Sequence, residues 1–126
     1  MLRFATPVGF LPTTDLDRAR TFYEHVLGLL VINADSFAVI VQTGRITIRL
    51  TNVGDQLRPQ VFTVFGWEVD DLRAEMAELA ERGVDFLRVD GLEQDDSGVW
   101  TAPGGSLIAW FKDPEGNTLS LASHNE

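Results

Sequence analysis

Side chains that usually carry out chemistry are sparse in this sequence. Cysteine is absent, which removes thiolate nucleophiles, disulfides and zinc–thiolate sites together. The only histidines are His25, whose charge would suit the end of an expected helix, and His124, in a tail to which we assign no role. Asp95 and Asp96 are adjacent, and a solvated acidic turn is expected there rather than paired-carboxylate chemistry. The sequence has no phosphate-binding glycine loop and no nucleophile elbow.

The stretch 106–122 predicts a β-hairpin with two unlike faces. Apolar residues recur at every second position, and 113–117 (DPEGN) is a dense turn signal. One face is wholly apolar, whereas the other mixes apolar, aromatic and polar side chains. Ile108, Trp110 and Ser120 lie on this mixed face, where a ligand could contact the indole. A tryptophan packed in the core is the alternative interpretation.

A second hairpin is expected around the dipeptide 43–44. Pairing Gln42 with Arg45 gives one purely apolar face, which must cover a helix, and one face that carries Arg49. A buried guanidinium must be paired. An internal acid such as Glu68 is the expected partner of Arg49, and a ligand anion is the alternative.

The remaining elements indicate an internal repeat. Asp15 to Gly28 and Asp70 to Gly83 are both steps of thirteen residues, with Thr14 and Asp70 as the expected helix caps. The pattern predicts an α+β fold of two βαβββ modules in a single domain over 1–126. The expected segments are a strand over 8–14, a helix over 15–28, strands over 37–42 and 45–51, a connection over 52–60, a strand over 61–69, a helix over 70–83, a strand over 84–89, a mobile rim loop over 92–105 that contains Trp100, and the closing hairpin. Module 1 would span about 1–52, the linker 53–60 and module 2 about 61–126.

Composition excludes several classes of function. The chain has 126 residues and a net charge of −9, from 19 acidic against 10 basic residues, which argues against nucleic-acid binding. The charge would steer a cationic ligand, although solubility alone explains it. No run of eighteen apolar residues could span a membrane, and the first ten residues (MLRFATPVGF) lack a signal-peptide pattern. We therefore expect no membrane partner and a cytoplasmic location.

Two strings, TTDLDRARTFYEHVLGL (13–29) and WFKDPEGNTLSL (110–121), resemble the glyoxalase, bleomycin-resistance and dioxygenase superfamily, also called vicinal oxygen chelate proteins. The resemblance extends over nearly the whole chain. It implies two βαβββ modules that form a half-open barrel around a central pocket. It also implies a homodimer in which modules are exchanged or shared between chains.

The resemblance also indicates which residues would be expected to bind a metal. Metal-dependent members of the superfamily place His or Glu at four inward strand positions, which map onto Val8, Arg49, Val64 and Ser120 here. None of these four offers an imidazole or a carboxylate. We therefore expect no metal and no cofactor. In fosfomycin-resistance members an aromatic residue at the place of Trp110 lines the active site.

These observations predict a metal-free small-molecule binding protein that resembles bleomycin-resistance and drug-sequestration proteins. An apolar, aromatic cavity with a few polar anchors would capture an aromatic or cationic ligand. The expected site, with Trp100 at its rim, comprises Phe10, Arg49, Phe62, Val64, Glu68, Trp100, Ile108, Trp110 and Ser120. No catalytic residue is assigned.

Two alternatives stay open. The first is an enzyme of the same superfamily, a lyase, isomerase or dioxygenase with a displaced metal site, or a metal-free acid/base catalyst using Glu68 or Glu115. The second is a structural or regulatory dimer without a ligand.

Overall fold

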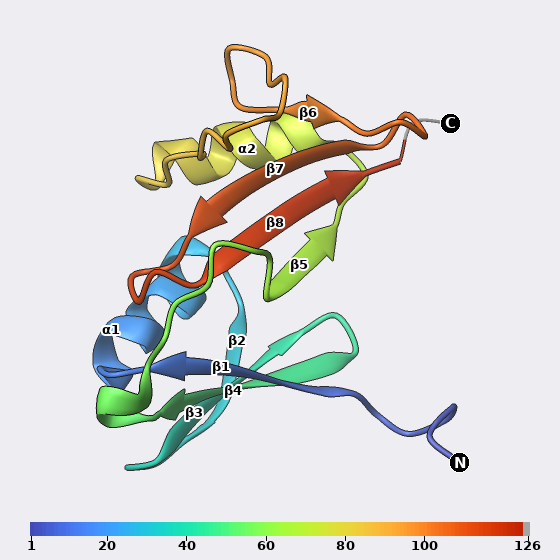
Figure 1. Ribbon diagram of the computed structural model, residues 1–126. Helices are drawn as coiled ribbons and strands as arrows, with labels where there is room; N and C mark the ends of the chain where they lie inside the picture. The colour runs from blue at the N-terminus through green and yellow to red at the C-terminus, as the bar shows by residue number, and fades with distance from the viewer. Residues whose placement is uncertain (125–126) are drawn as a thin grey trace. The chain divides into compact units, whose positions relative to one another are not determined.

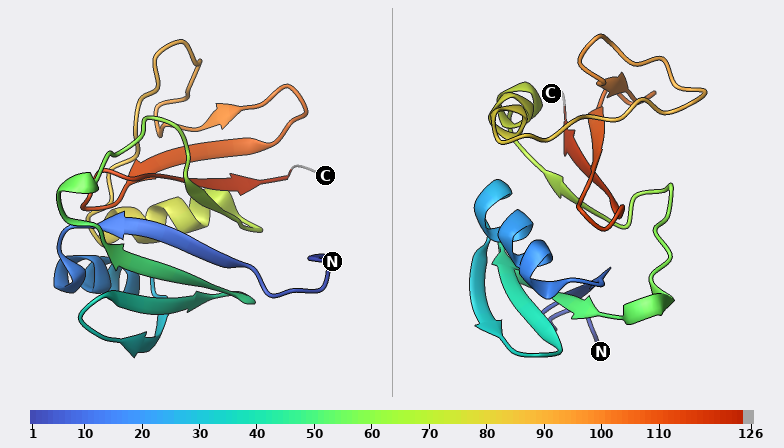
Figure 2. Two further views of the ribbon diagram at one scale, coloured as in Figure 1. Left: turned by 60° about the horizontal axis from the view of Figure 1, so that its bottom comes forward. Right: turned by 90° about the vertical axis from the view of Figure 1, so that its left-hand side faces the viewer.

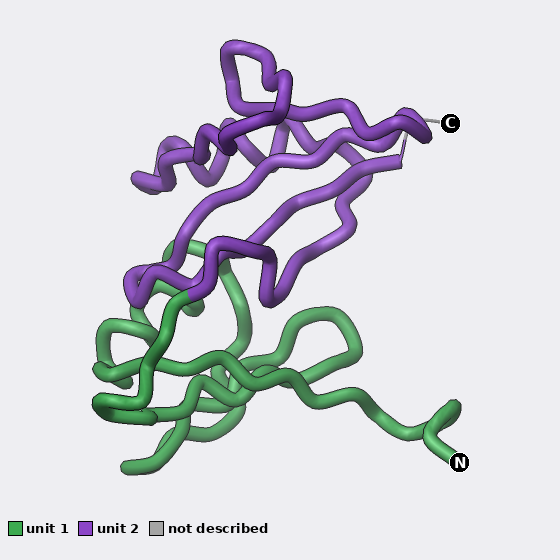
Figure 3. Tube along the Cα trace, viewed as in Figure 1, with its two compact units in different colours: residues 1–59 green, residues 60–126 purple. Residues whose placement is uncertain are grey.

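The computed structural model describes residues 1–124 and divides into two compact units, residues 1–59 (unit 1) and the residues from 60 onward (unit 2) (Figure 3). Each unit contains one four-stranded sheet and follows the order strand, helix, then three strands (Figure 1). The predicted α+β class and the βαβββ modules are confirmed. The half-open barrel concerns how the two units meet, and that part stays a prediction. Within residues 1–124, no helix is long and apolar enough to cross a membrane.

The sheet of unit 1 has the strand order β1–β4–β3–β2, with β1 parallel to β4 and the other pairs antiparallel. Pro12 predicts an edge position for the first strand, because proline has no N–H to donate to a neighbour, and β1 does lie at the edge. The elements of unit 1 are β1 (Val8–Thr13), α1 (Leu16–Thr21), the π-helical turn η1 (Phe22–Val26), β2 (Leu30–Ala34), β3 (Ala38–Thr43), β4 (Ile46–Asn52) and the 3-10 turn η2 (Gly54–Gln56).

Both α-helices begin one residue later than the sequence predicted. The expected caps, Thr14 and Asp70, are wrong. Asp15 and Asp71 are the N-caps, and each carboxylate accepts the backbone N–H three residues further on, at 3.1 Å. Threonine and aspartate both cap helices well, so the runs T-T-D and D-D each offer a choice that spacing alone does not resolve. The predicted end of the first helix is confirmed by Gly28, which adopts a φ of 76° just after η1.

The first hairpin has a register two residues away from the predicted one. Gln42 pairs with Thr47, not with Arg45, and Gly44 and Arg45 form the loop. Gly44 has a φ of 56°, a conformation that glycine tolerates and that would strain Thr43 in its place. Because the shift is an even number of residues, every side chain stays on its predicted face.

β2 is an element that the sequence pattern did not assign. Its register against β3 shifts between Val31 and Asn33, which interrupts the two-residue alternation on which strand prediction depends. It is also the second edge strand of the sheet. Leu30 and Ile32 are consequently exposed, at 62% and 49%.

The sheet of unit 2 has the order β5–β8–β7–β6, with β5 parallel to β8. Its elements are β5 (Phe65–Glu68), α2 (Leu72–Glu81), β6 (Trp100–Thr101), β7 (Leu107–Lys112) and β8 (Thr118–Ser123). Three expectations are wrong here. β5 begins at Phe65, so 61–64 do not belong to the strand expected over 61–69. The segment 84–89 is not a strand and makes only an isolated bridge, from Phe86 to Phe111. Trp100 does not lie in a loop, because β6 pairs with β7.

The core of unit 2 lies between the sheet and α2, which runs along one face of the strands (Figure 2). The side chains at alternate positions of the β7–β8 hairpin are between 0% and 4% exposed, namely Ala109, Phe111, Leu119 and Leu121. From the helix, Leu72, Met76 and Leu79 are buried. The Phe86 ring meets the Phe111 ring edge to face, with centroids 5.8 Å apart. The wholly apolar face predicted for the closing hairpin is therefore confirmed.

The burial of Phe111 gives a test of this packing. Phe111→Ala should lower the free energy of unfolding by about 3–5 kcal/mol, because the side chain is fully buried and its loss leaves a cavity. Phe37→Ala is the matched control, since Phe37 is 78% exposed and its loss should change stability by less than about 0.5 kcal/mol. Urea denaturation followed by circular dichroism measures both. Equal losses in the two variants would contradict the assignment of the core.

Candidate functional site

The face of the second sheet opposite α2, here called the mixed face of unit 2, holds most of the predicted site residues. Strand register places Trp110 opposite Ser120, and Ile108 opposite Ala122 on one side and Trp100 on the other. Residues that pair directly project to the same side of a sheet. The full set on this face is Gly66, Glu68, Trp100, Ile108, Trp110, Lys112, Thr118, Ser120 and Ala122.

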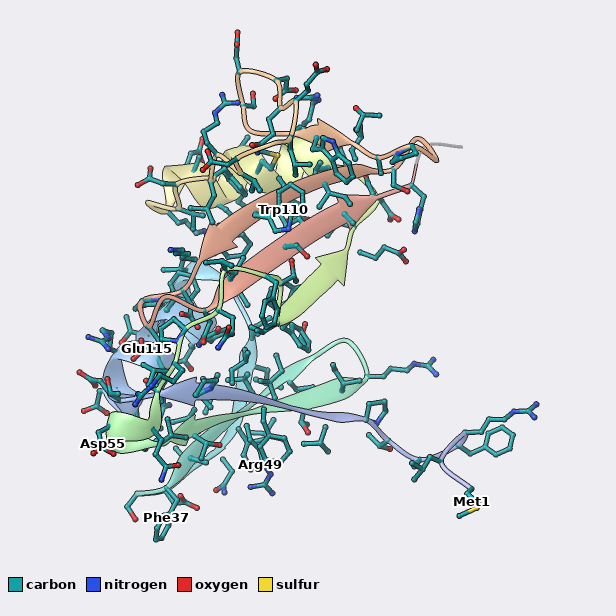
Figure 4. The ribbon with its side chains drawn as sticks, viewed as in Figure 1. Met1, Phe37, Arg49, Asp55, Trp110 and Glu115 are labelled. Atoms are coloured by element: carbon teal, nitrogen blue, oxygen red, sulfur yellow. The ribbon has the colours of Figure 1, made fainter. Side chains whose placement is uncertain are left out.

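Trp110 is held in a defined orientation on this face (Figure 4). Its Nε1–H donates to the Thr63 hydroxyl at 3.0 Å, from the segment that precedes β5. The Trp100 ring lies beside it, with centroids 6.1 Å apart and planes inclined by 34°. Both indoles are half-buried rather than packed into the core. The hydrogen bond satisfies the one polar atom of Trp110, so its ring presents an apolar surface.

A hollow of about 290 Å³ opens beside Trp110. Most of its walls are apolar, and the two hydroxyls in them already take part in hydrogen bonds. Thr63 accepts from Trp110, and Thr118 donates to the Gln60 carbonyl at 2.7 Å. The lining residues are Val61, Phe62, Thr63, Leu87, Val89, Trp110 and Thr118. Only Phe62 and Trp110 among them were predicted as site residues. Thr118 lies in β8, and the others lie in 61–63 and 87–89, which were expected to be strands but are not.

Gly66 allows β5 to lie close to β8. A side chain there would place its Cβ 3.0 Å from the Ser120 carbonyl oxygen and closer still to Oγ. Ser120 therefore occupies the space above Gly66 and lies beside Trp110 on the mixed face. Val64, another predicted site residue, precedes β5 and donates its N–H to the Thr118 carbonyl at 2.9 Å, but it does not line the hollow.

Three hydrogen-bonded polar side chains lie at one end of the mixed face. Two of the sequence-based expectations are wrong there. Glu68 bonds Nε2 of His124, and Nδ1 of the same ring lies 2.8 Å from Ser106 Oγ. The expectation that His124 has no role in the structure is wrong. Arg49, the expected partner of Glu68, is exposed rather than buried, so the reason for an internal pair does not apply. The register of the closing hairpin, continued by one pair, already sets Ser106 opposite His124, which is the signal that sequence reasoning missed.

The other two predicted site residues lie in unit 1. Phe10 in β1 pairs with Arg49 in β4, so both project from the face of that sheet opposite α1. Phe10 is 67% exposed. Nearby, the backbone N–H groups of Phe37 and Ala38, with a smaller contribution from the charge of Arg49, lower the pKa of Asp35. A single pocket that joins Phe10 and Arg49 to the residues of unit 2 stays a prediction.

The segment before Trp100 is fixed by an extensive set of hydrogen bonds. Asp95 Oδ1 accepts the N–H groups of Ser97 and Val99, both at 2.9 Å, and Oδ2 accepts from Arg73 at 2.7 Å. Gln94 bridges to backbone groups on both sides of the segment. Asp95 and Asp96 are exposed and lie in a turn, as expected, and Asp95 has a structural role in addition. It holds the chain that leads into β6 and so positions Trp100.

Metal ligands are scarce in this arrangement. Across the described residues 1–124, no group of three His, Asp or Glu side chains is placed to hold a metal ion. The four positions that the family resemblance marks as metal ligands hold Val8, Arg49, Val64 and Ser120. The metal-free state itself stays a prediction.

The family model of the Glyoxalase/Bleomycin resistance protein/Dioxygenase superfamily matches residues 4–121. The chain belongs to this superfamily, as the two sequence strings predicted. No curated protein matches the chain.

Solved structures show the same fold at low sequence identity. Lactoylglutathione lyase from Agrobacterium tumefaciens is 19% identical, with a TM-score of 0.76, over 98% of this chain and 96% of that one. TnmS3, an antibiotic binding protein from Streptomyces sp. CB03234, is 22% identical, with a TM-score of 0.75, over 99% of both chains. A member of the superfamily from Sphaerobacter thermophilus DSM 20745 is 21% identical, with a TM-score of 0.75, over 98% of this chain and 100% of that one.

The bonds to Asp95 lead to a pH-dependent prediction. The N–H of Val99 and then the Arg73 guanidinium hold the pKa of Asp95 below its usual value of 3.8. A carboxylate with a lowered pKa stabilises the folded state above its usual pKa and loses that effect as the pH falls through the lowered value. Asp95→Asn should therefore lower the melting temperature at pH 7, and the difference from wild type should shrink at about pH 3.

Asp96→Asn is the matched control, because it removes the neighbouring carboxylate and leaves the bonds of Asp95 in place. Thermal unfolding of the three proteins across this pH range is the measurement. A difference between wild type and Asp95→Asn that is independent of pH would refute the assignment.

Proposed function

We propose that this protein binds a small molecule on the mixed face of unit 2 and does so without a metal. The observation that carries the proposal is the half-buried Trp110, whose indole N–H is fixed by Thr63 and whose ring borders an apolar hollow. Apolar hollows with few polar groups are typical of small-molecule sites. An indole whose polar atom is already satisfied offers contact area at little cost in conformational entropy.

The ligand that best suits this surface is planar and aromatic. The two tilted indoles, Trp100 and Trp110, favour ring-to-ring contact, which contributes about 0.5–1.5 kcal/mol beyond area burial. The charges on this face are Glu68 at one end and Lys112 at the other. The net charge of −9 favours a neutral or cationic ligand over an anion, through long-range steering. Arg49 would favour an anion if unit 1 also contributes to the site.

Relatives of known structure support a binding function only at the level of fold. TnmS3 is described as an antibiotic binding protein, and the structure from Agrobacterium tumefaciens as a lactoylglutathione lyase. Proteins with this fold therefore include both binding proteins and enzymes, so a function has to be inferred from the residues of the site. Side chains without a carboxylate or imidazole occupy the family's metal-ligand positions, which favours binding over metal-dependent chemistry.

The proposal predicts that aromatic dyes bind through Trp110. Trp110→Ala should weaken binding of proflavine, a planar cation, by about tenfold or more, because large aromatic anchors in pockets commonly contribute 2 kcal/mol or above. Thr63→Val should cause a smaller loss, since it frees the indole from its hydrogen bond. Binding should be unchanged by a chelator. Dye fluorescence titrations give the dissociation constants, and anilinonaphthalene sulfonate provides the anionic comparison.

Trp67→Phe is the matched control, since Trp67 pairs with Leu121 on the α2 side of the sheet and contacts Phe65. It should leave dye affinity unaltered. The melting temperature of Trp110→Ala should stay well above that of Phe111→Ala, because Trp110 is half-buried and Phe111 is not exposed at all. Wild-type affinity in Trp110→Ala, or binding that disappears with chelator, would count against the proposal.

A homodimer is also part of the proposal. Large apolar side chains are exposed on unit 1, including Phe10 at 67%, Leu30 at 62% and Ile32 at 49%. β2 and β6 are edge strands that offer unpaired backbone groups. Sedimentation equilibrium at micromolar concentration should give twice the monomer mass of 14.0 kDa. A single species at the monomer mass would rule the homodimer out.

A further inference from the structure

We propose that Ser106, His124 and Glu68 form a metal-free nucleophilic site, in which the Ser106 hydroxyl accepts an acyl group from activated esters. The three side chains form one hydrogen-bonded series, from Glu68 through both nitrogens of His124 to Ser106 Oγ. A nucleophile within reach of a base, and a base oriented by a third group, is the arrangement by which serine becomes reactive. This activity is additional to ligand binding at Trp110 and does not depend on it.

The partners of His124 determine which nitrogen can act as the base. A carboxylate only accepts hydrogen bonds, so Nε2 must carry a hydrogen that it donates to Glu68. In the neutral ring Nδ1 then has no hydrogen and accepts from the Ser106 hydroxyl, at 2.8 Å. This tautomer is the one needed to take a proton from serine. The negative charge of Glu68 would also stabilise the imidazolium that forms.

Three strand ends hold this group together. Ser106 immediately precedes β7, His124 immediately follows β8, and Glu68 is the last residue of β5. Leu107 pairs with Ser123, so the next pair outward is Ser106 and His124, with their side chains on the mixed face. The backbone ladder thus sets Ser106 beside His124, and the Glu68 side chain reaches His124 from the neighbouring strand.

The surroundings leave room for a substrate. Glu68, Val69, Asp70 and His124 line a hollow of about 390 Å³, and Ser106 lies beside it, hydrogen-bonded to the nitrogen of the His124 ring that does not bond Glu68. Ile108 lies one step further along the mixed face, opposite Trp100. Ser106 itself is half-buried, and His124 is exposed, so solvent and small esters can reach both. An ester with an aromatic leaving group could therefore place its carbonyl at Ser106 and its ring toward the indoles.

The reaction balances without any cofactor. The proton of Ser106 Oγ passes to His124 Nδ1 as Oγ bonds to the ester carbonyl carbon. The bond between that carbon and the leaving oxygen then breaks, and the leaving alcohol takes the proton from Nδ1. Water repeats the sequence on the acyl-serine: its proton goes to Nδ1, its oxygen bonds to the carbonyl carbon, and Ser106 departs with the proton restored. The net change is ester plus water to acid plus alcohol.

The test uses the full chain and p-nitrophenyl acetate at neutral pH. Release of p-nitrophenolate gives the rate, and peptide mapping by mass spectrometry locates the acetyl group. We expect acetyl on Ser106 of the wild type. Ser106→Ala should abolish acetylation at this position. His124→Gln should slow acetylation about a hundredfold, because general-base assistance contributes at least that much. Glu68→Gln keeps the shape of the side chain and should also slow the reaction. Ser97→Ala is the control for an exposed serine and should react as wild type.

Peptide mapping distinguishes acetylation of Ser106 from non-specific acetylation of amino groups. The amino groups of Lys112 and of the N-terminus can also react, and label confined to them would overturn the proposal. So would label on Ser106 that forms at an unchanged rate in His124→Gln or Glu68→Gln, or label that resides on His124 instead of Ser106. Circular dichroism of each variant shows that the strands are intact. Loss of dye binding in Trp110→Ala bears on the ligand site alone, so the two proposals fail independently.

Discussion

The pairing of β7 with β8 is the interaction on which unit 2 depends. Its register sends Phe111 toward α2 and Trp110 to the opposite side, next to Ser120. One hairpin thus supplies both the core and the mixed face. A slip of one residue would exchange the two faces, burying Lys112 and exposing Phe111. The strong hydrophobic gain on the helix side therefore fixes the positions of the side chains on the other side, although these contribute less to stability.

Much of this organisation could be predicted because alternation and helix spacing are properties of the local sequence. The faces of both hairpins, the edge position of β1 and the end of the first helix at Gly28 all follow from such patterns. The boundaries of helices and the registers of strand pairs are predicted less well from such patterns. Asp15 and Thr14 are both good caps, and moving the turn from 43–44 to 44–45 preserves every face, so the sequence contains little that discriminates between the choices.

The rest of the site depends on contacts between distant segments. Trp100 looked like a loop residue because β6 has only two residues, too few to show a period, and because acidic and glycine residues surround it. Its position depends on Asp95, which reaches Arg73 across 22 residues of sequence. The bond from Trp110 to Thr63 spans 47 residues and joins the hairpin to a segment without regular structure. No local pattern encodes either contact.

The two proposals for the mixed face place ligand contact at its centre and proton transfer at its rim. Of the positions that the family resemblance marks as metal ligands, Val64 and Ser120 lie in unit 2. Ser120 brings no charge to the middle of the mixed face, where it pairs with Trp110. The ionisable groups lie at the rim instead, where Glu68 and His124 bond each other near the strand ends. Water reaches Glu68 there, so keeping the charge of its carboxylate costs little desolvation energy. Apolar contact at the centre and proton transfer at the rim are therefore compatible on one sheet, because the low-dielectric surface that favours the first would penalise the second.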